Sequence, residues 1–533
     1  MTTKTVGEHL IELLEYQGVD IVFGIPGVHT IELYRGLAGS KIRHITPRHE
    51  QGAGFMADGY ARVSGKPGVA FVITGPGLTN ILTAMAQARQ DSIPMLVISG
   101  VNPQVTKGKG LGLLHELPDQ QALAAKVALW SKTIESADEL EPVLVQAFAD
   151  FKAKRGGPIH IEIPTDVMKL PAAATKNLTS APALPALPAT TLHKATAMIS
   201  ASRNPVILMG GGARTSAKLI SALAEKIDAP VVQTTNARGV MHKHRLTVPA
   251  SPSLAAVRSL LATSDCVIAI GTEWGQTEFD MNNDAGFPAL THVIRIDIDA
   301  AQLKRQLSEV AIAGDAGAVL AALIPQITER KPESGAVRAE ACRIAAKAEI
   351  GPRMRGHLDV VKIIRDTLPG SVIVGDSTQA TYAGNLYYDH DRAGGWFNSA
   401  TGFGTLGYAA GAVVGAALAN KKGATVCISG DGGIQFSLAE LGSAADIDAS
   451  IIYVVWNNNG YQEIEAAMQR VAIKPIGVTP QSPDFCAIAK AYGIASAKPH
   501  NLEEFATALK MAKKSGKPFL IELDEKVAEG KTG

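Results

Sequence analysis

The sequence is short of cysteine, of excess charge and of targeting signals. Its four cysteines lie far apart and form no CxxC pair, which argues against a disulfide framework or a zinc site and favours a reducing, cytoplasmic setting. With 51 Lys+Arg against 50 Asp+Glu, the chain lacks the basic excess that is typical of nucleic-acid-binding proteins. The first residues contain no apolar core of the kind found in signal peptides.

Long hydrophobic runs without charge are also scarce. One stretch, 397–420, carries no charge and is long enough to span a bilayer. It consists mostly of Gly and Ala, however, and two lysines follow it. We therefore expect a buried turn and helix here, and no membrane partner.

The chain does contain many short, mostly apolar runs, most of them followed by a glycine turn and a helical pattern. They lie at 69–73, 95–98, 205–209, 266–270, 293–297, 371–374, 425–429 and 451–456. Short, wholly apolar strands that alternate with helices predict an α/β protein with open parallel sheets covered on both faces. A length of 533 residues allows three to four domains of this size.

Two stretches divide the chain into thirds. Residues 171–191 are rich in Pro, Ala and Thr and predict a linker. A polar stretch at 326–356 predicts a second linker, either helical or irregular. The expected domains are therefore 1–170, 192–325 and 357–533. The outer two end on similar strands, at 157–163 and 516–523, which suggests two versions of one fold, with chance as the alternative for so short a match.

Two polar motifs in the last third follow apolar strands directly. They are Gly430-Asp431-Gly432-Gly433 and Asn457-Asn458-Asn459-Gly460. Glycines at a strand end let the backbone approach a phosphate group, and a following helix offers free N–H groups. Asp431, Asn458 and the Gly460 carbonyl group supply the hard oxygens that suit Mg²⁺. A simple turn is the alternative for the first motif alone.

The spacing of these motifs resembles the diphosphate and metal signature of thiamine-diphosphate enzymes. The whole chain is similar to the family of acetolactate synthases and 2-oxoacid decarboxylases. That resemblance implies a pyrimidine-binding, a central and a diphosphate-binding domain, with thiamine diphosphate and Mg²⁺ as cofactors. It also implies a homodimer, or a homotetramer made of two dimers, in which Glu50 of one subunit meets Asp431 and Asn458 of its neighbour.

The segment 47–62 places Glu50 between a strand and a helix of small residues. On residue type alone, Glu50 is an ordinary charge at a helix start. By resemblance it is the catalytic glutamate that activates the cofactor pyrimidine, in an apolar pocket that raises its pKa. The resemblance implies the following cofactor-binding residues: Gly27, Glu50, Thr74, Asn80, Ser377, Thr378, Gly404, Leu406, Gly430, Asp431, Gly432, Gly433 and Asn458.

Some of these roles have a plain alternative. Leu406 is implied to wedge beneath the two cofactor rings, and otherwise it is a core leucine. His29 and His115 are candidate catalytic residues, either for proton transfer or for binding the substrate carboxylate, and structural histidines otherwise. One of Glu463 and Glu465 is expected near the site, without a choice between them.

The implied reaction is the decarboxylation of a 2-oxo acid, after which the remaining fragment either takes a proton or attacks a second carbonyl group. The second outcome is that of acetolactate synthases, from which this chain departs at 114–116, 164–166 and 271–280. The likeness in 23–99 is instead to decarboxylases of 5-guanidino-2-oxopentanoate in arginine catabolism. Acids that could pair with a guanidinium group are Glu116, Glu273, Glu278 and Asp280, and exposed acids without a ligand are the alternative.

The central third contains a glycine run at 209–214 and an Ile-Asp-Ile-Asp run at 296–299. Synthases that hold FAD carry both patterns, but a glycine run after a strand is weak evidence, and FAD is not favoured here. A nicotinamide enzyme or a nucleotide-binding regulatory protein is the alternative class. Neither needs Asp431 and Asn458 at their separation, nor Glu50 in its segment.

Overall fold

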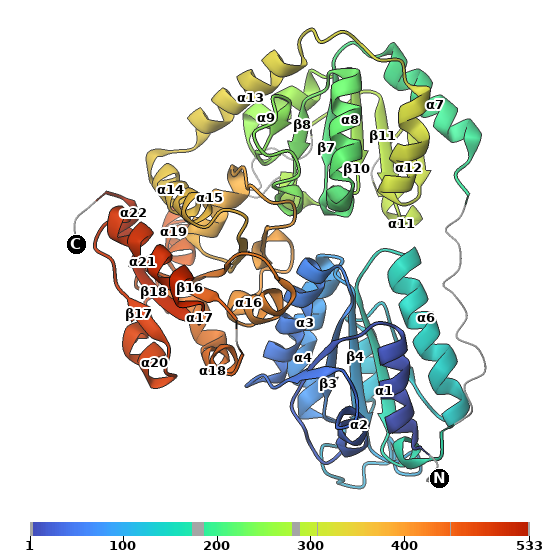
Figure 1. Ribbon diagram of the computed structural model, residues 1–533. Helices are drawn as coiled ribbons and strands as arrows, with labels where there is room; N and C mark the ends of the chain where they lie inside the picture. The colour runs from blue at the N-terminus through green and yellow to red at the C-terminus, as the bar shows by residue number, and fades with distance from the viewer. Residues whose placement is uncertain (1–3, 173–185, 280–287, 306–307, 448, 531–533) are drawn as a thin grey trace.

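The computed structural model describes residues 4–172, 186–279, 288–305, 308–447 and 449–530. They form three parallel sheets of six strands each, with helices packed around every sheet. Figure 1 shows the central domain above, the first domain at lower right and the third at left. The predicted α/β architecture of three open parallel-sheet domains is therefore confirmed.

The first domain contains the sheet β2-β1-β3-β4-β6-β5. Its strands are β1 (Ile21–Gly24), β2 (Arg43–Ile45), β3 (Gly68–Val72), β4 (Met95–Val101), β5 (Trp130–Thr133) and β6 (Pro158–Pro164). Its helices are α1 (Val6–Tyr16), α2 (Ile31–Leu37), α3 (Glu50–Ser64), α4 (Pro76–Gln90), α5 (Gln120–Ala125) and α6 (Leu140–Ala153). The α1 helix begins with a capping box between Thr5 and Glu8, which fixes its first turn.

The central domain contains the sheet β12-β11-β10-β7-β8-β9. Its strands are β7 (Pro205–Met209), β8 (Val231–Gln233), β9 (Thr247–Val248), β10 (Cys266–Ile270), β11 (Val293–Asp297) and β12 (Val310–Ala313). Its helices are α7 (Ala189–Ala201), α8 (Ala217–Ile227), α9 (Ala255–Ala262), α10 (Gln276–Phe279), α11 (Ala300–Leu303) and α12 (Ala316–Leu323). Residues 173–185 of the first expected linker lie outside the described part, and α13 (Gly335–Glu349) forms much of the second.

The third domain contains the sheet β14-β13-β15-β16-β18-β17. Its strands are β13 (Val372–Gly375), β14 (Trp396–Asn398), β15 (Thr425–Gly430), β16 (Ile451–Asn457), β17 (Ala495–Ala497) and β18 (Phe519–Asp524). Its helices are α14 (Pro352–Thr367), α15 (Gln379–Leu386), α16 (Tyr408–Ala419), α17 (Asp431–Ile434), α18 (Glu440–Ala445), α19 (Gln462–Arg470), α20 (Phe485–Ala491), α21 (Leu502–Ser515) and α22 (Glu525–Ala528).

The strand order of the third sheet repeats that of the first, position for position. The two strands with similar sequences, β6 and β18, occupy the same place, next to the edge strand. The central sheet has a different order. This topology confirms that the outer thirds are two versions of one fold.

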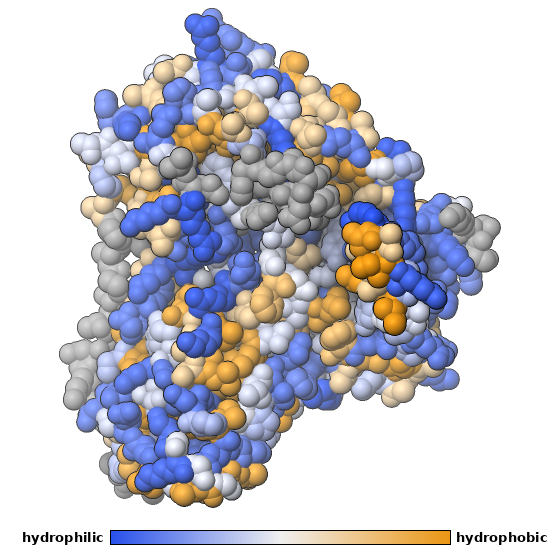
Figure 2. All heavy atoms as spheres, turned by 180° about the vertical axis from the view of Figure 1, so that it is seen from behind, coloured by the Kyte–Doolittle hydropathy of each residue, from blue (hydrophilic) through white to orange (hydrophobic). Residues whose placement is uncertain are grey.

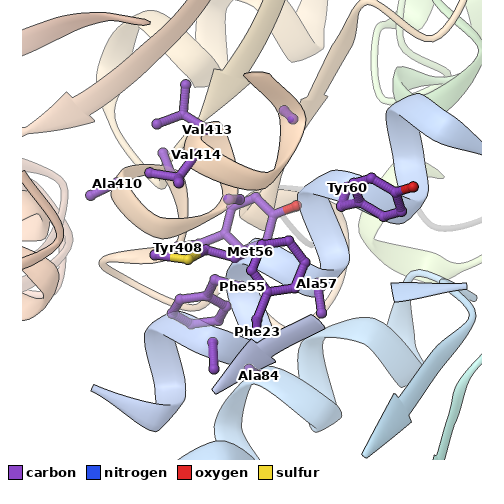
Figure 3. Packing of buried hydrophobic residues seen from close by; sticks show 14 of the residues in the cluster. Phe23, Phe55, Met56, Ala57, Tyr60, Ala84, Tyr408, Ala410, Val413 and Val414 are labelled. Atoms are coloured by element: carbon purple, nitrogen blue, oxygen red, sulfur yellow. The ribbon is translucent and has the colours of Figure 1, made fainter. Parts of the chain in front are cut away.

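The first and third domains share one hydrophobic core, in which α3 packs along α16 (Figure 3). Phe55 of α3 lies edge-on against Tyr408 of α16, with ring centroids 5.3 Å apart, and both side chains are buried. The stretch 397–420 thus contributes a turn and a buried helix, as predicted. Within the described residues, no helix combines the length and the hydrophobicity needed to cross a membrane.

Candidate active site

The carboxyl ends of β13, β15 and β16 meet at one edge of the third sheet and border a cavity of about 370 Å³. The predicted residues that line it are Ser377, Thr378, Gly404, Leu406, Gly430, Asp431, Gly432, Gly433, Asn458 and Gly460. Residues far apart in the sequence therefore come together at one site. Its lining also includes Tyr382, Tyr461 and Gln462, which carried no motif signal in the sequence.

The glycines at the end of β15 and directly after it leave space that a larger side chain would occupy. A Cβ atom on Gly432 would lie 2.5 Å from the Tyr461 ring, and one on Gly430 would lie 3.0 Å from the Thr378 hydroxyl oxygen. Gly432 and Gly433 belong to α17 itself, which has only four residues, so the close approach of the backbone matters more here than a long helix.

Oxygen atoms of Asp431, Asn458 and Gly460 lie close together beside these glycines. The side-chain amide of Asn458 has one terminal atom 3.1 Å from Asp431 Oδ1 and 2.8 Å from the Gly460 carbonyl oxygen. If that atom is the amide nitrogen, it donates to both oxygens. If it is the amide oxygen, three oxygens meet and repel one another unless a cation lies among them. The Ser482 hydroxyl group donates to Asp431 Oδ2, which leaves Oδ1 facing the cluster.

The segment 398–407 forms another wall of the cavity. Gly404 has a φ of +75° and Gly407 a φ of +80°, so both adopt a backbone conformation that favours glycine. The Gly407 N–H donates to Asp376 Oδ2 at 2.8 Å, and the Ser429 hydroxyl donates to the same oxygen at 2.9 Å. Complete burial raises the pKa of Asp376 to about 6, against the opposing effect of these hydrogen bonds.

Glu50 lies in the first domain, at the first position of α3. Its Oε2 accepts a hydrogen bond of 2.9 Å from the Asn80 amide of α4. The chain before it is fixed by Glu440 of α18, which accepts from the backbone N–H groups of Arg48 and His49 at 3.1 Å each. In the single chain Glu50 is half-buried, whereas the resemblance implies a closed apolar pocket.

His29 and His115 face each other with ring centroids 5.5 Å apart. Their Nδ1 atoms and the Thr74 hydroxyl oxygen are buried, and they have no hydrogen-bond partner among the described residues. Burial, with a smaller effect from the neighbouring His115, lowers the pKa of His29. Gly27 packs so closely on Ile73 that a Cβ atom there would overlap its side chain. Four of the predicted residues thus form a second, separate cluster.

These two parts of the predicted site do not share a cavity within one chain. The lining of the 370 Å³ cavity comes entirely from the third domain among the described residues. Glu50, Asn80, His29 and His115 lie outside that lining.

The acidic candidates, those near the site and those for a cationic substrate, also lie in different places. Glu463 lines the 370 Å³ cavity and accepts from the Gln379 amide at 2.9 Å, whereas Glu465 points elsewhere, toward Gln469. Glu116 is bound by its own loop, since it accepts from the Gly110 N–H at 2.9 Å and from the Leu113 N–H at 3.0 Å.

The other acids belong to the central domain. Glu273 and Glu278 line a larger cavity of about 550 Å³, next to Gly210, Gly211 and Gly212. Glu273 pairs there with Arg155 and Arg305, each at 3.0 Å. Burial raises the pKa of Glu278 to about 7. Asp280 lies outside the described residues.

The comparisons with known proteins agree with this geometry. Residues 4–123 match the N-terminal TPP-binding domain of thiamine pyrophosphate enzymes, 192–323 their central domain and 376–523 their C-terminal TPP-binding domain. The chain therefore belongs to the thiamine pyrophosphate enzyme family.

Two relatives and one solved structure define its place further. The chain is 39% identical, over 98% of its length and 94% of the other, to the Pseudomonas aeruginosa protein named "Probable 2-ketoarginine decarboxylase AruI". It is 32% identical to the acetolactate synthase isozyme 1 large subunit of Escherichia coli, over 85% and 82% of the two chains. The fold matches that of the thiamine diphosphate-dependent 4-hydroxybenzoylformate decarboxylase of Rhodococcus jostii RHA1, with a TM-score of 0.82, 22% identity, and 98% and 99% of the two chains covered.

Proposed function

We propose that this protein is a thiamine-diphosphate- and Mg²⁺-dependent decarboxylase that converts 5-guanidino-2-oxopentanoate to 4-guanidinobutanal and CO₂. The observation that supports it most is the convergence of oxygens from Asp431, Asn458 and Gly460. Adjacent ligands of an octahedral Mg²⁺ with bonds of about 2.1 Å lie about 3 Å apart. The spacings of 3.1 and 2.8 Å in this chain fit that geometry with the amide oxygen turned toward the cluster.

When bound, thiamine diphosphate supplies a thiazolium ring that takes up the electron pair left as CO₂ departs. The chain's own residues then have separate tasks. Asp431, Asn458 and the Gly460 carbonyl group hold the metal ion, and the glycines at 430–433 let the backbone approach the diphosphate group. Leu406 supports the cofactor rings. Glu50 holds or releases a proton at Oε1, because the Asn80 amide occupies Oε2.

The proposed enzyme is a homodimer, or a homotetramer built from two dimers, with each active site between two chains. The separation of Glu50, Asn80 and the two histidines from the 370 Å³ cavity supports this arrangement, because a second copy is needed to bring them together. Exposed apolar side chains flank both parts. Val28 and Leu114 are 60% exposed next to the two histidines, and Phe403 and Ile464 are 52% exposed beside the cavity.

The surface is consistent with such a contact. Seen from behind, hydrophobic residues gather on the third domain at right and on the first domain at lower left (Figure 2). The thiols of Cys266, Cys342 and Cys427 are free and buried, which supports the proposed cytoplasmic location.

The proposed substrate carries a guanidinium group, and Glu463 is the acid placed to receive it. Besides the candidate metal ligand Asp431, it is the one carboxylate among the described residues that line the cavity. A carboxylate binds a guanidinium group through two parallel hydrogen bonds. The name of the 39% identical relative, in which 2-ketoarginine is the same compound, supports this choice.

Acetolactate synthesis from two 2-oxo acids is the second candidate function, favoured by the 32% identity to a synthase. An arginine could bind the carboxylate group of a second oxoacid. Arg155 and Arg305, which pair with Glu273, line the central cavity and not the 370 Å³ cavity, which disfavours a second oxoacid site in the 370 Å³ cavity. FAD in the central cavity is not favoured, because Glu273, which lines it, is already paired with Arg155 and Arg305.

The test supplies the full-length enzyme, loaded with thiamine diphosphate and Mg²⁺, with 5-guanidino-2-oxopentanoate, 2-oxohexanoate or pyruvate, and identifies the products by mass. We expect 4-guanidinobutanal as the main product, and no activity after both cofactors are removed. Glu463→Gln should raise KM for the cationic substrate about tenfold and leave 2-oxohexanoate unaffected, with Glu465→Gln as the matched control. Equal or better turnover of pyruvate would refute the cationic substrate, and condensed hydroxy-oxo acids would indicate a synthase.

A further inference from the structure

The segment 400–406 separates the two cavities described above. Ala400 lines both of them, Thr401 lines the central one, and Gly404 and Leu406 line the candidate cofactor cavity. This segment belongs to the third domain. Two of its residues, Thr401 and Thr405, are nevertheless bound by the first domain of the same chain.

Two residues at the C-terminal end of α4, Gln87 and Asp91, bind the segment. The Thr401 hydroxyl group donates to Asp91 Oδ1 at 2.8 Å, and the Thr405 N–H donates to Gln87 Oε1 at 3.3 Å. The Asp91 side chain is 2% exposed, and Gln87 is fully buried. Because the acceptor side chains are buried, these hydrogen bonds constrain the segment more than surface contacts would.

Asp91 and Gln87 are themselves fixed. Gln87 Nε2 donates to Asp91 Oδ2 at 2.8 Å, and Arg62 Nη2 donates to the same oxygen at 2.6 Å. Arg62 is held in turn by Asp58 at 2.6 Å and lies 5.1 Å from the centre of the Phe397 ring. The acceptors that face Thr401 and Thr405 therefore have little freedom to move.

The segment has few hydrogen bonds within its own domain: the Gly404 N–H donates to the Ser399 carbonyl oxygen at 3.0 Å, and the Thr401 hydroxyl group also lies 3.1 Å from the Asn398 carbonyl oxygen. Gly402, Gly404 and Gly407 permit many backbone conformations. The Asp376 carboxylate fixes Gly407, but the bonds to Thr401 and Thr405 act on the residues that precede Leu406. Without them, the Leu406 side chain would be presented by a loop with several accessible conformations.

We propose that Asp91 and Gln87 are positioning residues, which hold the segment 401–406 in the conformation that receives thiamine diphosphate. The inference rests on the proposed function and adds to it a role for the first domain within each chain. Neither residue lines the candidate cofactor cavity, so both act through the segment and do not touch the cofactor.

The test compares the full-length wild type with Thr401→Val, Thr401→Ser and Gln87→Met. Thr196→Val is the matched control, because it removes a similar hydroxyl contact, to the Leu192 carbonyl group, in α7. Amide hydrogen exchange is measured for the peptide that covers 400–406 in the cofactor-free protein. The dissociation constant of thiamine diphosphate is then measured with saturating Mg²⁺.

We expect Thr401→Val and Gln87→Met to accelerate exchange in this peptide about five- to tenfold, as the loss of one buried hydrogen bond implies. They should weaken thiamine diphosphate binding by a similar factor, while Thr401→Ser and Thr196→Val resemble the wild type. Unchanged exchange, or faster exchange with unchanged cofactor affinity, would overturn the positioning role. A wild type that does not bind thiamine diphosphate would instead refute the proposed function itself.

Discussion

Gly59 of α3 is the residue whose substitution we expect to weaken the packing between the first and third domains. A methyl group on Gly59 would lie 2.7 Å from the carbonyl carbon of Ala412 in α16 and would overlap its oxygen, whereas ordinary contact begins at 3.4 Å. Gly415 makes the reciprocal approach, with its Cβ position 2.6 Å from the Met56 carbonyl carbon. The two helices thus meet backbone to backbone at this crossing.

The Gly59→Ala substitution requires the helices to move apart by at least about 0.7 Å, the difference between those two distances. Overpacking of this kind costs about 1–3 kcal/mol, and the lost backbone contacts cost about 0.5–1 kcal/mol more. Alanine gains about 1 kcal/mol in helix propensity. The net loss of about 2 kcal/mol should lower Tm by about 4–8 °C.

The assay is thermal unfolding of the full-length protein, followed by circular dichroism. Gly39→Ala is the matched control, since its Cβ position meets no atom within 4 Å and its φ is not positive. We expect the control to stay close to the wild type. Equal Tm values for Gly59→Ala and Gly39→Ala would refute the close crossing of α3 and α16.

Three further predictions concern the site and the core. Glu50→Gln should lower kcat by about 10²–10⁴-fold with Tm unchanged, as measured by product formation and thermal unfolding. Asp431→Asn should raise the Mg²⁺ concentration for half-maximal activity at least tenfold, measured by metal titration. Burial lowers the pKa of His160 to about 3. The unfolded chain therefore takes up this proton first as pH falls below about 6.5, and stability should drop by about 2 kcal/mol between about pH 7 and pH 5. Urea unfolding of His160→Gln should lack this component, and parallel pH profiles would contradict it.

The strands and their order of appearance could be predicted from the sequence, because a short, wholly apolar run before a glycine turn is too short for a buried helix and suits a central parallel strand. The run 266–270 became β10 with the same bounds, and 205–209 became β7. The glycine and asparagine motifs could also be brought together in advance, since the carboxyl ends of neighbouring parallel strands share one sheet edge.

Other features depend on contacts that the sequence does not reveal. The bonds from Asp91 and Gln87 to the 401–405 segment join residues more than 300 positions apart, and no local pattern marks either partner. For the same reason, the sequence could not show which acid belongs to which cavity. Glu273 lies in the central cavity and Glu463 in the third domain because the fold separates them, and not because their neighbours in the sequence differ.

The α3 helix has one end at Glu50 and the rest of its length against the third domain. In the proposed dimer, its first residue would serve one active site, while α16 follows the segment that serves the other. A helix of 15 residues is about 22 Å long and stiff over that length. In that dimer, α3 would connect the two active sites directly, so we expect thiamine diphosphate bound at one site to change the affinity of the other.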